Sequence, residues 1–223
     1  INPADIHIGK YSNDYETGDG YDIDTAVERV IEGINGILWK TKSFNIDKIL
    51  FCLGNDILHI DNVYNTTTKG TNQDVHSMSN HDYQSGFHLS HSLKSWFRNC
   101  KDVTVDASVS SRKYYNYGNS LIGLEHGDGA KMDKLPLLMA QEQPELWAET
   151  KFRYWYLHHL HHKVKHKWLD AKDYIGCTVE YLRSPSGTDS WHSRKGYTGV
   201  PKAVEGILHE KENGQVARIT HYF

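Results

Sequence analysis

Apolar and polar residues recur along the chain with two different periods, which predict a mixture of helices and strands. From Thr25 to Leu38 apolar residues return every three or four positions, and this period is typical of an amphipathic helix. Thr25 and Glu28 match a capping box at its start. The apolar face expected to be buried consists of Val27, Val30, Ile31, Ile34 and Leu38.

Short apolar runs bounded by turn residues predict the strands. Two further helices are expected: Gly86–Asn99, and Leu135–Trp147 with an interruption at Pro144. We expect the first of these to pack through Phe87, Leu89, Leu93, Trp96 and Phe97. Residues 11–21 are expected to form a loop, and Glu212–Gln215 a hairpin turn. The predicted strands are Lys48–Leu53 (buried), Val103–Asp106, Arg112–Tyr117, Ser120–Leu124, Tyr154–His158, Cys177–Leu182 and Val204–Leu208.

The helix between an N-terminal segment and the Lys48–Leu53 run suggests a strand–helix–strand crossover unit, with the helix covering one face of a sheet. No internal repeat or linker divides the chain. We therefore expect one mixed α/β domain that spans residues 1–223.

Composition narrows the function classes. The chain has 25 Lys and Arg against 28 Asp and Glu, a net charge of −3, which argues against coating of DNA by bulk electrostatics but leaves room for a local basic groove. No apolar run approaches the roughly 18 residues that a membrane span requires. The three widely spaced cysteines do not suggest a disulfide framework, so a cytoplasmic location is expected. The 15 histidines tilt the composition towards metal chemistry.

The residues that could bind a ligand or catalyse a reaction occur in short polar motifs near the ends of these predicted elements. On its own, the histidine-rich segment 154–167 is equally well explained as a solvated tract. Residues two apart on an extended chain project to the same side, so paired Asp and His residues can hold one site. Polar groups at strand ends of an open α/β sheet face the crevice where ligands bind. The motifs are Asp5-Ile-His7, Gly54-Asn-Asp56, Asn80-His81-Asp82, His126-Gly-Asp128 and His159-Leu-His161.

This ordered set of motifs resembles the calcineurin-like metallophosphoesterases, whose motifs are D-x-H, G-D, G-N-H-D/E, a single His and G-H-x-H. The resemblance extends from Asp5 to His161, and the stretches GNDILHIDN, TTTKGT and GTDSWHSRKGY are similar to bacterial and prophage members. It implies an α/β fold, a four-layer α-β-β-α sandwich of the metallophosphoesterase type. It also implies two divalent metal ions at the strand ends. We expect Mn²⁺, with Fe, Zn, Ni or Mg as alternatives.

The resemblance also implies individual roles. His81 is implied to contact the scissile phosphate and to bind or protonate an oxygen there. Asp82 and Asp128 are implied to orient neighbouring histidines. Asp56 would bridge the two metals. The first metal would be held by Asp5, His7, Asp56 and His161, and the second by Asp56, Asn80, His126 and His159.

The sequence departs from the family pattern in three places. Ser79 and His158 stand where the family has glycine before its motifs, and Asp5 and Asn80 lack the apolar run that precedes the corresponding family motifs. We therefore expect further residues before Ile1 and near Met78–Ser79.

The resemblance implies a two-metal phosphoesterase that hydrolyses phosphodiesters by attack of a metal-activated hydroxide. A phosphomonoesterase of the same fold and a non-catalytic metal-binding scaffold are the alternatives. The expected partner is a phosphoester substrate, with short or single-stranded nucleic acid as the hypothesis, and no membrane. Residues that could line the substrate path are Lys163, Lys165, Lys167, Trp191, His192, Arg194, Lys195 and Tyr197, although solvated charges and a packed Trp191 are the simpler interpretation.

The remaining histidines match no motif. We expect His158 and His162 either to support the ligands from behind or to face solvent. Surface or hydrogen-bonded polar roles are expected for His59, His76, His88, His91, His209 and His221.

Overall fold

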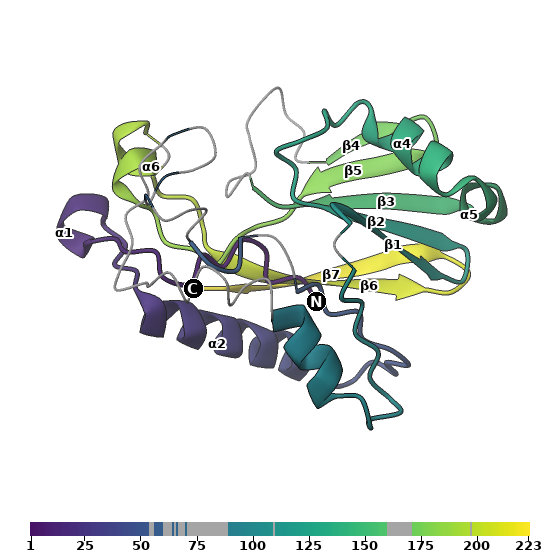
Figure 1. Cartoon of the computed structure of the whole chain (residues 1–223), viewed down its shortest axis with the longest axis horizontal. Coiled ribbons are helices and arrows are strands. Elements are labelled where there is room, and N and C mark those ends of the chain that lie inside the picture. Colours follow the sequence, from purple (N-terminus) through teal and green to yellow (C-terminus); the bar gives the residue numbers. More distant parts are fainter. Residues whose placement is uncertain are drawn as a thin grey trace.

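The computed structural model describes residues 1–53, 56–59, 64, 66, 70, 89–108, 110–159, 171–196 and 198–223. Its main feature is a five-stranded mixed sheet with the strand order β1-β2-β3-β5-β4 (Figure 1). The central strands β2, β3 and β5 are parallel, and the edge strands β1 and β4 are antiparallel to their neighbours. The strands are β1 Arg112–Tyr117, β2 Ser120–Glu125, β3 Phe152–Leu157, β4 Ala171–Tyr174 and β5 Cys177–Tyr181. The mixed α/β class and four of the predicted strands, those beginning at Arg112, Ser120, Tyr154 and Cys177, are confirmed.

One face of this sheet is covered by α4 (Leu135–Glu142) and α5 (Pro144–Glu149). Pro144 is the first residue of α5, so the predicted interruption of this helix is confirmed. Trp155 is fully buried under α4, where its indole Nε1 donates to the carbonyl of Leu135 over 3.0 Å. The core on this face contains Leu121, Leu135, Met139, Trp155, Leu157, Cys177 and Val179.

The opposite face packs against a two-stranded antiparallel sheet of β6 (Ala203–Glu210) and β7 (Gly214–Tyr222). The hairpin turn predicted between these strands is confirmed. Arg218 of β7 joins the two sheets, because its guanidinium contacts Glu205 Oε1 of β6 at 2.9 Å and Glu180 Oε2 of β5 at 2.5 Å. The apolar contact between the sheets contains Ala4, Ile122, Tyr156 and Leu182, with Ile207 packed against them.

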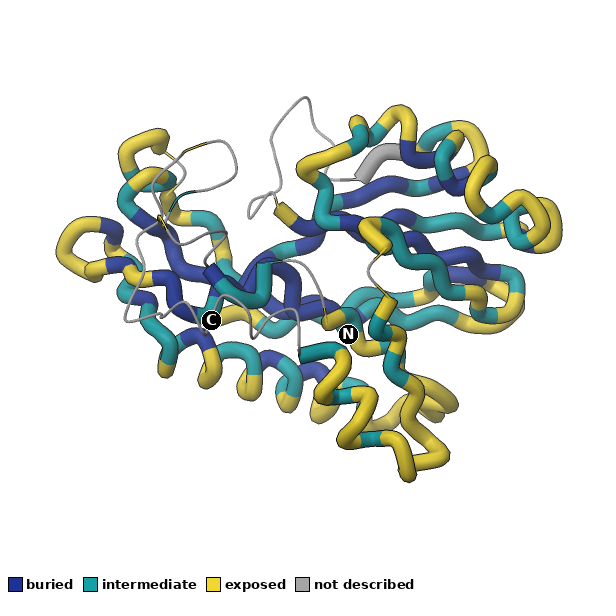
Figure 2. Tube along the Cα trace, in the orientation of Figure 1, coloured by how far each residue is buried: buried dark blue, intermediate teal, exposed yellow. Residues whose placement is uncertain are grey.

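Helix α2 (Ile23–Thr41) packs on β6 and β7 and confirms the predicted helix, but with a different cap and a partly different buried face. Its N-cap is Asp22, whose side chain accepts from the Thr25 amide, and not Thr25. The buried residues are Ala26, Gly33 and Ile37, and Figure 2 shows the buried turns alternating with exposed ones. The expected face was partly right, because Val30 and Ile34 are half-buried and Val30 packs against the cluster of Ile6, Tyr21 and Ala26. Three large apolar residues expected inside are exposed: Val27, Ile31 and Leu38.

The Lys48–Leu53 run is not a buried strand, and the predicted crossover unit is therefore wrong. Residues 45–53 have no strand assignment, and Ile49, Phe51 and Leu53 are exposed. This segment contacts the chain start instead, since Cys52 N donates to Ile1 O over 3.0 Å and Ile1 N to Leu50 O over 2.8 Å. An open cavity of about 810 Å³ separates residues 44–50 from β6 and from the β2 side chains. Within the described residues, no strand pairs with this run and buries it.

Three smaller predictions are also corrected. Val103–Asp106 has no strand assignment and is largely exposed, and the expected loop at 11–21 contains the short helix α1 (Asp14–Thr17). Residues 89–96 are helical as predicted, but Trp96 is 82% exposed and does not pack. Among the described residues, no helix is both long enough and apolar enough to cross a bilayer.

The parallel strands β2, β3 and β5 all end at the same edge of the main sheet, near the middle of the molecule (Figure 1). The loops that follow β2 and β3 carry His126 and His159, so the sheet brings two of the predicted ligands to one place.

Candidate metal centre

Five of the predicted metal ligands converge beyond this sheet edge, and the backbone explains how. Residues 7 and 8 run beside 56–59: His7 N donates to Asp56 O over 2.8 Å, and Ile8 N to Ile57 O over 2.6 Å. On the other side, His158 N donates to His126 O over 2.9 Å, which joins the loops after β2 and β3. The His159 amide donates to the carboxylate of Asp5, and this bond connects the N-terminal segment with the loop after β3.

The ligand atoms face one another at short range. His126 Nε2 lies 3.4 Å from Asp56 Oδ2, and His126 Nδ1 lies 3.6 Å from Asp5 Oδ1. His7 Nε2 is 3.8 Å from the same Asp56 oxygen. Asp56, His126 and His159 each offer an atom within 4.8 Å of the others, which is the spacing expected of ligands around one cation.

Burial decreases across the site. Asp5 is 1% exposed, Asp56 and His126 are half-buried, and His159 is exposed. A cation bound here would therefore contact buried ligands on one side and be accessible to solvent on the other. Catalytic metal sites need such an open position.

The backbone at the site is unusual in the same residues. Asp5, His7, Asp56 and His159 have φ angles of 46°, 53°, 52° and 66°, and they are all of the non-glycine residues with positive φ in the described part of the chain. The left-handed region costs a residue with a Cβ about 1–2 kcal/mol. Outliers of this kind gather at functional sites, where the surrounding structure holds them in place.

The charges of the side chains at the site favour binding of a cation. Burial, followed by the negative charge of Asp56, raises the pKa of Asp5 well above its usual range. Two carboxylates beside several imidazoles form a donor set that suits a divalent transition metal, and bound positive charge would offset the repulsion between Asp5 and Asp56. The described residues therefore fit a divalent cation.

His158 lies on the buried side of the site, next to Asp5. It is 3% exposed, and its Nδ1 lies 3.9 Å from Asp5 Oδ1. Burial lowers the pKa of His158 to about 3, so the ring is neutral at pH 7. Of the two roles expected for His158, the structure favours the one behind the ligands.

A buried ion pair lies next to the first motif. Lys10 is 1% exposed, and its Nζ lies 3.1 Å from Asp189 Oδ2 and donates to Gly187 O over 2.6 Å. Asp189 caps α6 (Ser190–Arg194), where its Oδ1 accepts from His192 N at 2.8 Å and from His192 Nδ1 at 2.7 Å. Burial alone would raise the pKa of Asp189, but the His192 hydrogen bonds and the Lys10 charge outweigh it and lower this pKa.

His59 is the functional candidate that sequence reasoning missed. It is 7% exposed, and its Nδ1 lies 3.1 Å from Nδ1 of His7. Burial lowers the pKa of His59 to about 3. Of the two roles expected for His59, the surface role was wrong, and the hydrogen-bonded polar role is confirmed. The signal in the sequence was its position three residues after Asp56, in the same turn.

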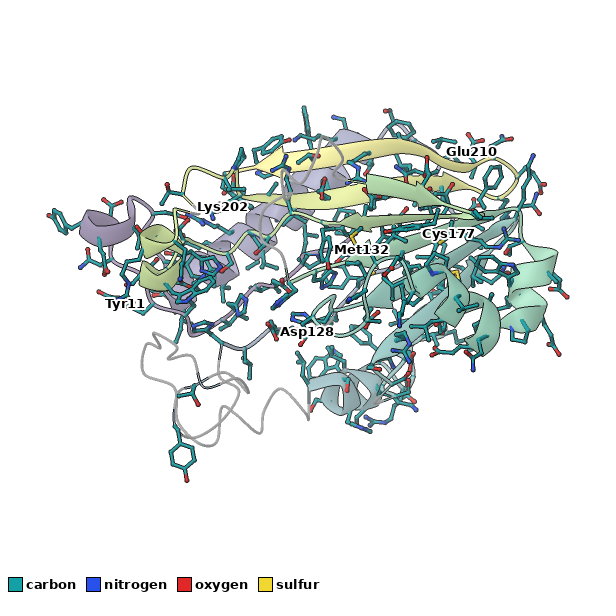
Figure 3. All side chains as sticks on the ribbon, turned by 90° about the horizontal axis from the view of Figure 1, so that it is seen from above. Tyr11, Asp128, Met132, Cys177, Lys202 and Glu210 are labelled. Atoms are coloured by element: carbon teal, nitrogen blue, oxygen red, sulfur yellow. The ribbon has the colours of Figure 1, made fainter. Side chains whose placement is uncertain are left out.

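The other predicted residues divide into two groups. Asp128 is exposed and lies near the middle of the molecule, away from Glu210 at the far end of the strands (Figure 3). Its negative charge contributes to raising the pKa of Asp5. Trp191 is 41% exposed, so the packed interpretation was wrong; Arg194 and Lys195 are exposed, and His192 is half-buried. Those outside the described residues are Asn80, His81, Asp82, His161, Lys163, Lys165, Lys167 and Tyr197.

Comparison of the chain with protein-family models, curated proteins and solved structures found no match. The candidate site therefore rests on the geometry and chemistry of the chain itself.

Proposed function

We propose that the chain is a two-metal-dependent phosphoesterase of the metallophosphoesterase type, with phosphodiesters as its preferred substrates. The observation that carries the proposal is the convergence of Asp5, His7, Asp56, His126 and His159 from four separate segments, with left-handed backbone at four of the five. Such a donor set has no evident structural purpose, because a buried carboxylate with a raised pKa costs stability.

The packing of the elements supports the four-layer α-β-β-α sandwich that this proposal includes. Helix α4 lies on the main sheet, that sheet packs on β6–β7, and α2 covers β6–β7 from the other side.

Each residue has a proposed task. Asp5, His7 and Asp56 would hold the first metal with His161, and Asp56, Asn80, His126 and His159 would hold the second. Two divalent ions at this edge would polarise the phosphoryl group and supply the nucleophile. His81 contacts a phosphate oxygen or protonates the leaving oxygen. The exposed cations Arg194, at the end of α6, and Lys195, its C-cap, follow Trp191, and this pattern suits a short single-stranded nucleic acid.

The test is Asp56→Ala, which removes the carboxylate common to both metal sets. After loading with Mn²⁺, we expect the wild-type chain to bind two ions and to hydrolyse bis-p-nitrophenyl phosphate, and we expect the variant to lose its activity. Asp106→Ala is the matched control, because Asp106 is an exposed carboxylate paired with Lys113 at 3.1 Å, on a different part of the chain. Undiminished turnover by Asp56→Ala would overturn the proposal.

The substrate panel separates the alternatives. Hydrolysis of p-nitrophenyl phosphate alone would make the protein a monoesterase, and cleavage of a short single-stranded oligonucleotide would support the nucleic-acid hypothesis. Binding of Mn²⁺ without turnover of any phosphoester would identify a non-catalytic scaffold.

A further inference from the structure

The ring of His59 lies directly against the ring of His7. The two Nδ1 atoms are 3.1 Å apart, the ring centroids are 5.0 Å apart, and the ring planes cross at 84°. This edge-to-face arrangement leaves Nε2 of His7 on the other side of its ring, 3.8 Å from Asp56 Oδ2. His7 is therefore held between His59 and the candidate metal centre.

The backbone fixes this pair of rings. His59 N donates to Ile8 O over 2.9 Å, Ile8 N donates to Ile57 O over 2.6 Å, and Ile8 forms a parallel bridge with Leu58. Because these bonds join the two segments on which the rings sit, His7 and His59 keep their relative position. The contact is a built feature of the fold and not a chance approach of two long side chains.

Proton counting limits the bond between the two rings to two possible directions. A neutral imidazole carries one N–H and one lone pair, so a hydrogen bond between two Nδ1 atoms needs one donor and one acceptor. If His59 accepts, His7 carries its hydrogen on Nδ1 and presents the Nε2 lone pair towards Asp56. If His59 donates, His7 carries its hydrogen on Nε2 and cannot bind a metal there.

We propose that His59 is a positioning residue that accepts the Nδ1–H of His7 and thereby holds His7 in the tautomer whose Nε2 binds the metal. Metal-bound imidazoles usually donate their second N–H to a neighbouring group, and loss of that group weakens metal binding about 10–100-fold. The acceptor here is another histidine. Its own hydrogen then lies on Nε2, a buried atom that has no hydrogen-bond partner in the part of the chain that the structure describes.

The acceptor has a defined position in the ring, and this allows a sharp test. An asparagine places its amide group near the position of Nδ1, whereas a glutamine places it near Nε2. His59→Asn therefore keeps an acceptor within reach of His7, and His59→Gln fills the space without one. His59→Ala removes both. His209→Ala is the matched control, because His209 is a partly buried histidine that contacts Tyr156 on the far side of the main sheet from α4.

This inference rests on the proposed function, and it is measured as Mn²⁺ affinity in competition with a metal-chelating dye. We expect binding by His59→Ala and His59→Gln to weaken about 10–100-fold, and binding by His59→Asn and His209→Ala to stay within a few-fold of wild type. Urea unfolding of each variant separates loss of metal from loss of fold. If His59→Ala does not fold, the comparison of the two amide variants decides the question.

The tautomer gives a second readout that a purely structural role would not move. Long-range ¹H–¹⁵N spectra of the Zn²⁺-loaded chain should show the proton of His7 on Nδ1 in wild type and in His59→Asn. Equal metal affinity in the Asn and Gln variants, or a wild-type His7 proton on Nε2, would overturn the proposal. Weak binding in Asp56→Ala together with normal binding in all His59 variants would leave the proposed function intact and remove only the role of His59.

Discussion

Gly33→Ala tests the packing of α2 on the second sheet. Gly33 lies in the middle of α2, where every helix-propensity argument favours alanine. A Cβ at this position would lie 2.6 Å from Cγ2 and 2.9 Å from Cβ of Val204 on β6. Val204 is fully buried, and the contact at 2.9 Å is to its Cβ, which can move only together with the β6 backbone. The substitution therefore sets a local gain against a tertiary clash.

The magnitudes decide the sign. Overpacking of a well-packed core costs about 1–3 kcal/mol, and a contact with a buried β-carbon lies near the top of this range. Replacement of glycine by alanine inside a helix returns about 1 kcal/mol. We expect a net loss of about 2 kcal/mol in the free energy of unfolding.

The assay is urea denaturation monitored by circular dichroism, with the slope of the transition compared among variants. Asn35→Ala, at an exposed position of the same helix, is the control and should gain about 0.5 kcal/mol from propensity alone. The double variant Gly33→Ala/Val204→Ala should lose less than the sum of its single variants, because the clash is relieved. A Gly33→Ala midpoint at or above that of wild type would show that α2 does not pack closely on β6.

Two other predictions concern charged and titratable groups. Arg218→Met should lower the free energy of unfolding, measured in urea, by about 3–5 kcal/mol, because it removes the cation from the buried carboxylates Glu180 and Glu205. The triple variant Arg218→Met/Glu180→Gln/Glu205→Gln should recover much of that loss. The absence of any recovery would contradict the ion-pair argument. His209→Gln should flatten the dependence of stability on pH between about 4 and 6.5. Burial lowers the pKa of His209 to about 4, so the unfolded chain binds more protons in this window and wild-type stability falls as the pH decreases through it. The glutamine amide can still bond the Tyr156 hydroxyl, and urea midpoints at pH 7 and pH 5 that shift equally in both proteins would assign the effect to other groups.

Four strands of the main sheet were predictable because their burial follows from their own pattern, whereas β4, with only four residues at Ala171–Tyr174, was missed. Arg112–Tyr117 and Ser120–Glu125 pair with each other through a short turn, so the local sequence already contains both partners. Lys48–Leu53 is as apolar as these strands, but the burial of an apolar run depends on a neighbour that the run itself does not specify. Pattern alone therefore predicted a buried strand where the structure has an exposed segment.

Helix α2 also has one feature set by its own sequence and one set by its neighbours. Its length followed from the period of its apolar residues, whereas its buried face depended on the surface it meets. The period drew attention to large residues such as Ile31, which is 54% exposed. The contact with β6 is made where Gly33 faces Val204 and where Ile37 faces Gly206. Shape complementarity of this kind belongs to a pair of elements and is not visible in one of them.

The order of the motifs made the candidate site predictable, whereas strand ends helped only at His126 and His159, since no strand precedes Asp5, His7 or Asp56 among the described residues. Asp5, His7, Asp56, His126 and His159 were proposed as ligands, and the structure brings them together. His59 and the Lys10–Asp189 pair were missed, because a lone histidine or lysine in a sequence has the same pattern whether it is exposed or buried. Their burial arises from contacts between segments far apart in the chain, such as Lys10 with residues 186–189.

The left-handed backbone at Asp5, His7, Asp56 and His159 has a consequence for engineering this protein. Glycine adopts these φ angles without the penalty that a Cβ brings, so a redesign that maximises stability would favour glycine at all four positions. Each such exchange would strengthen the fold and delete a proposed ligand in the same step. Stability and the proposed activity are therefore in direct competition at these residues, and thermostable variants of this chain should be sought elsewhere in the molecule.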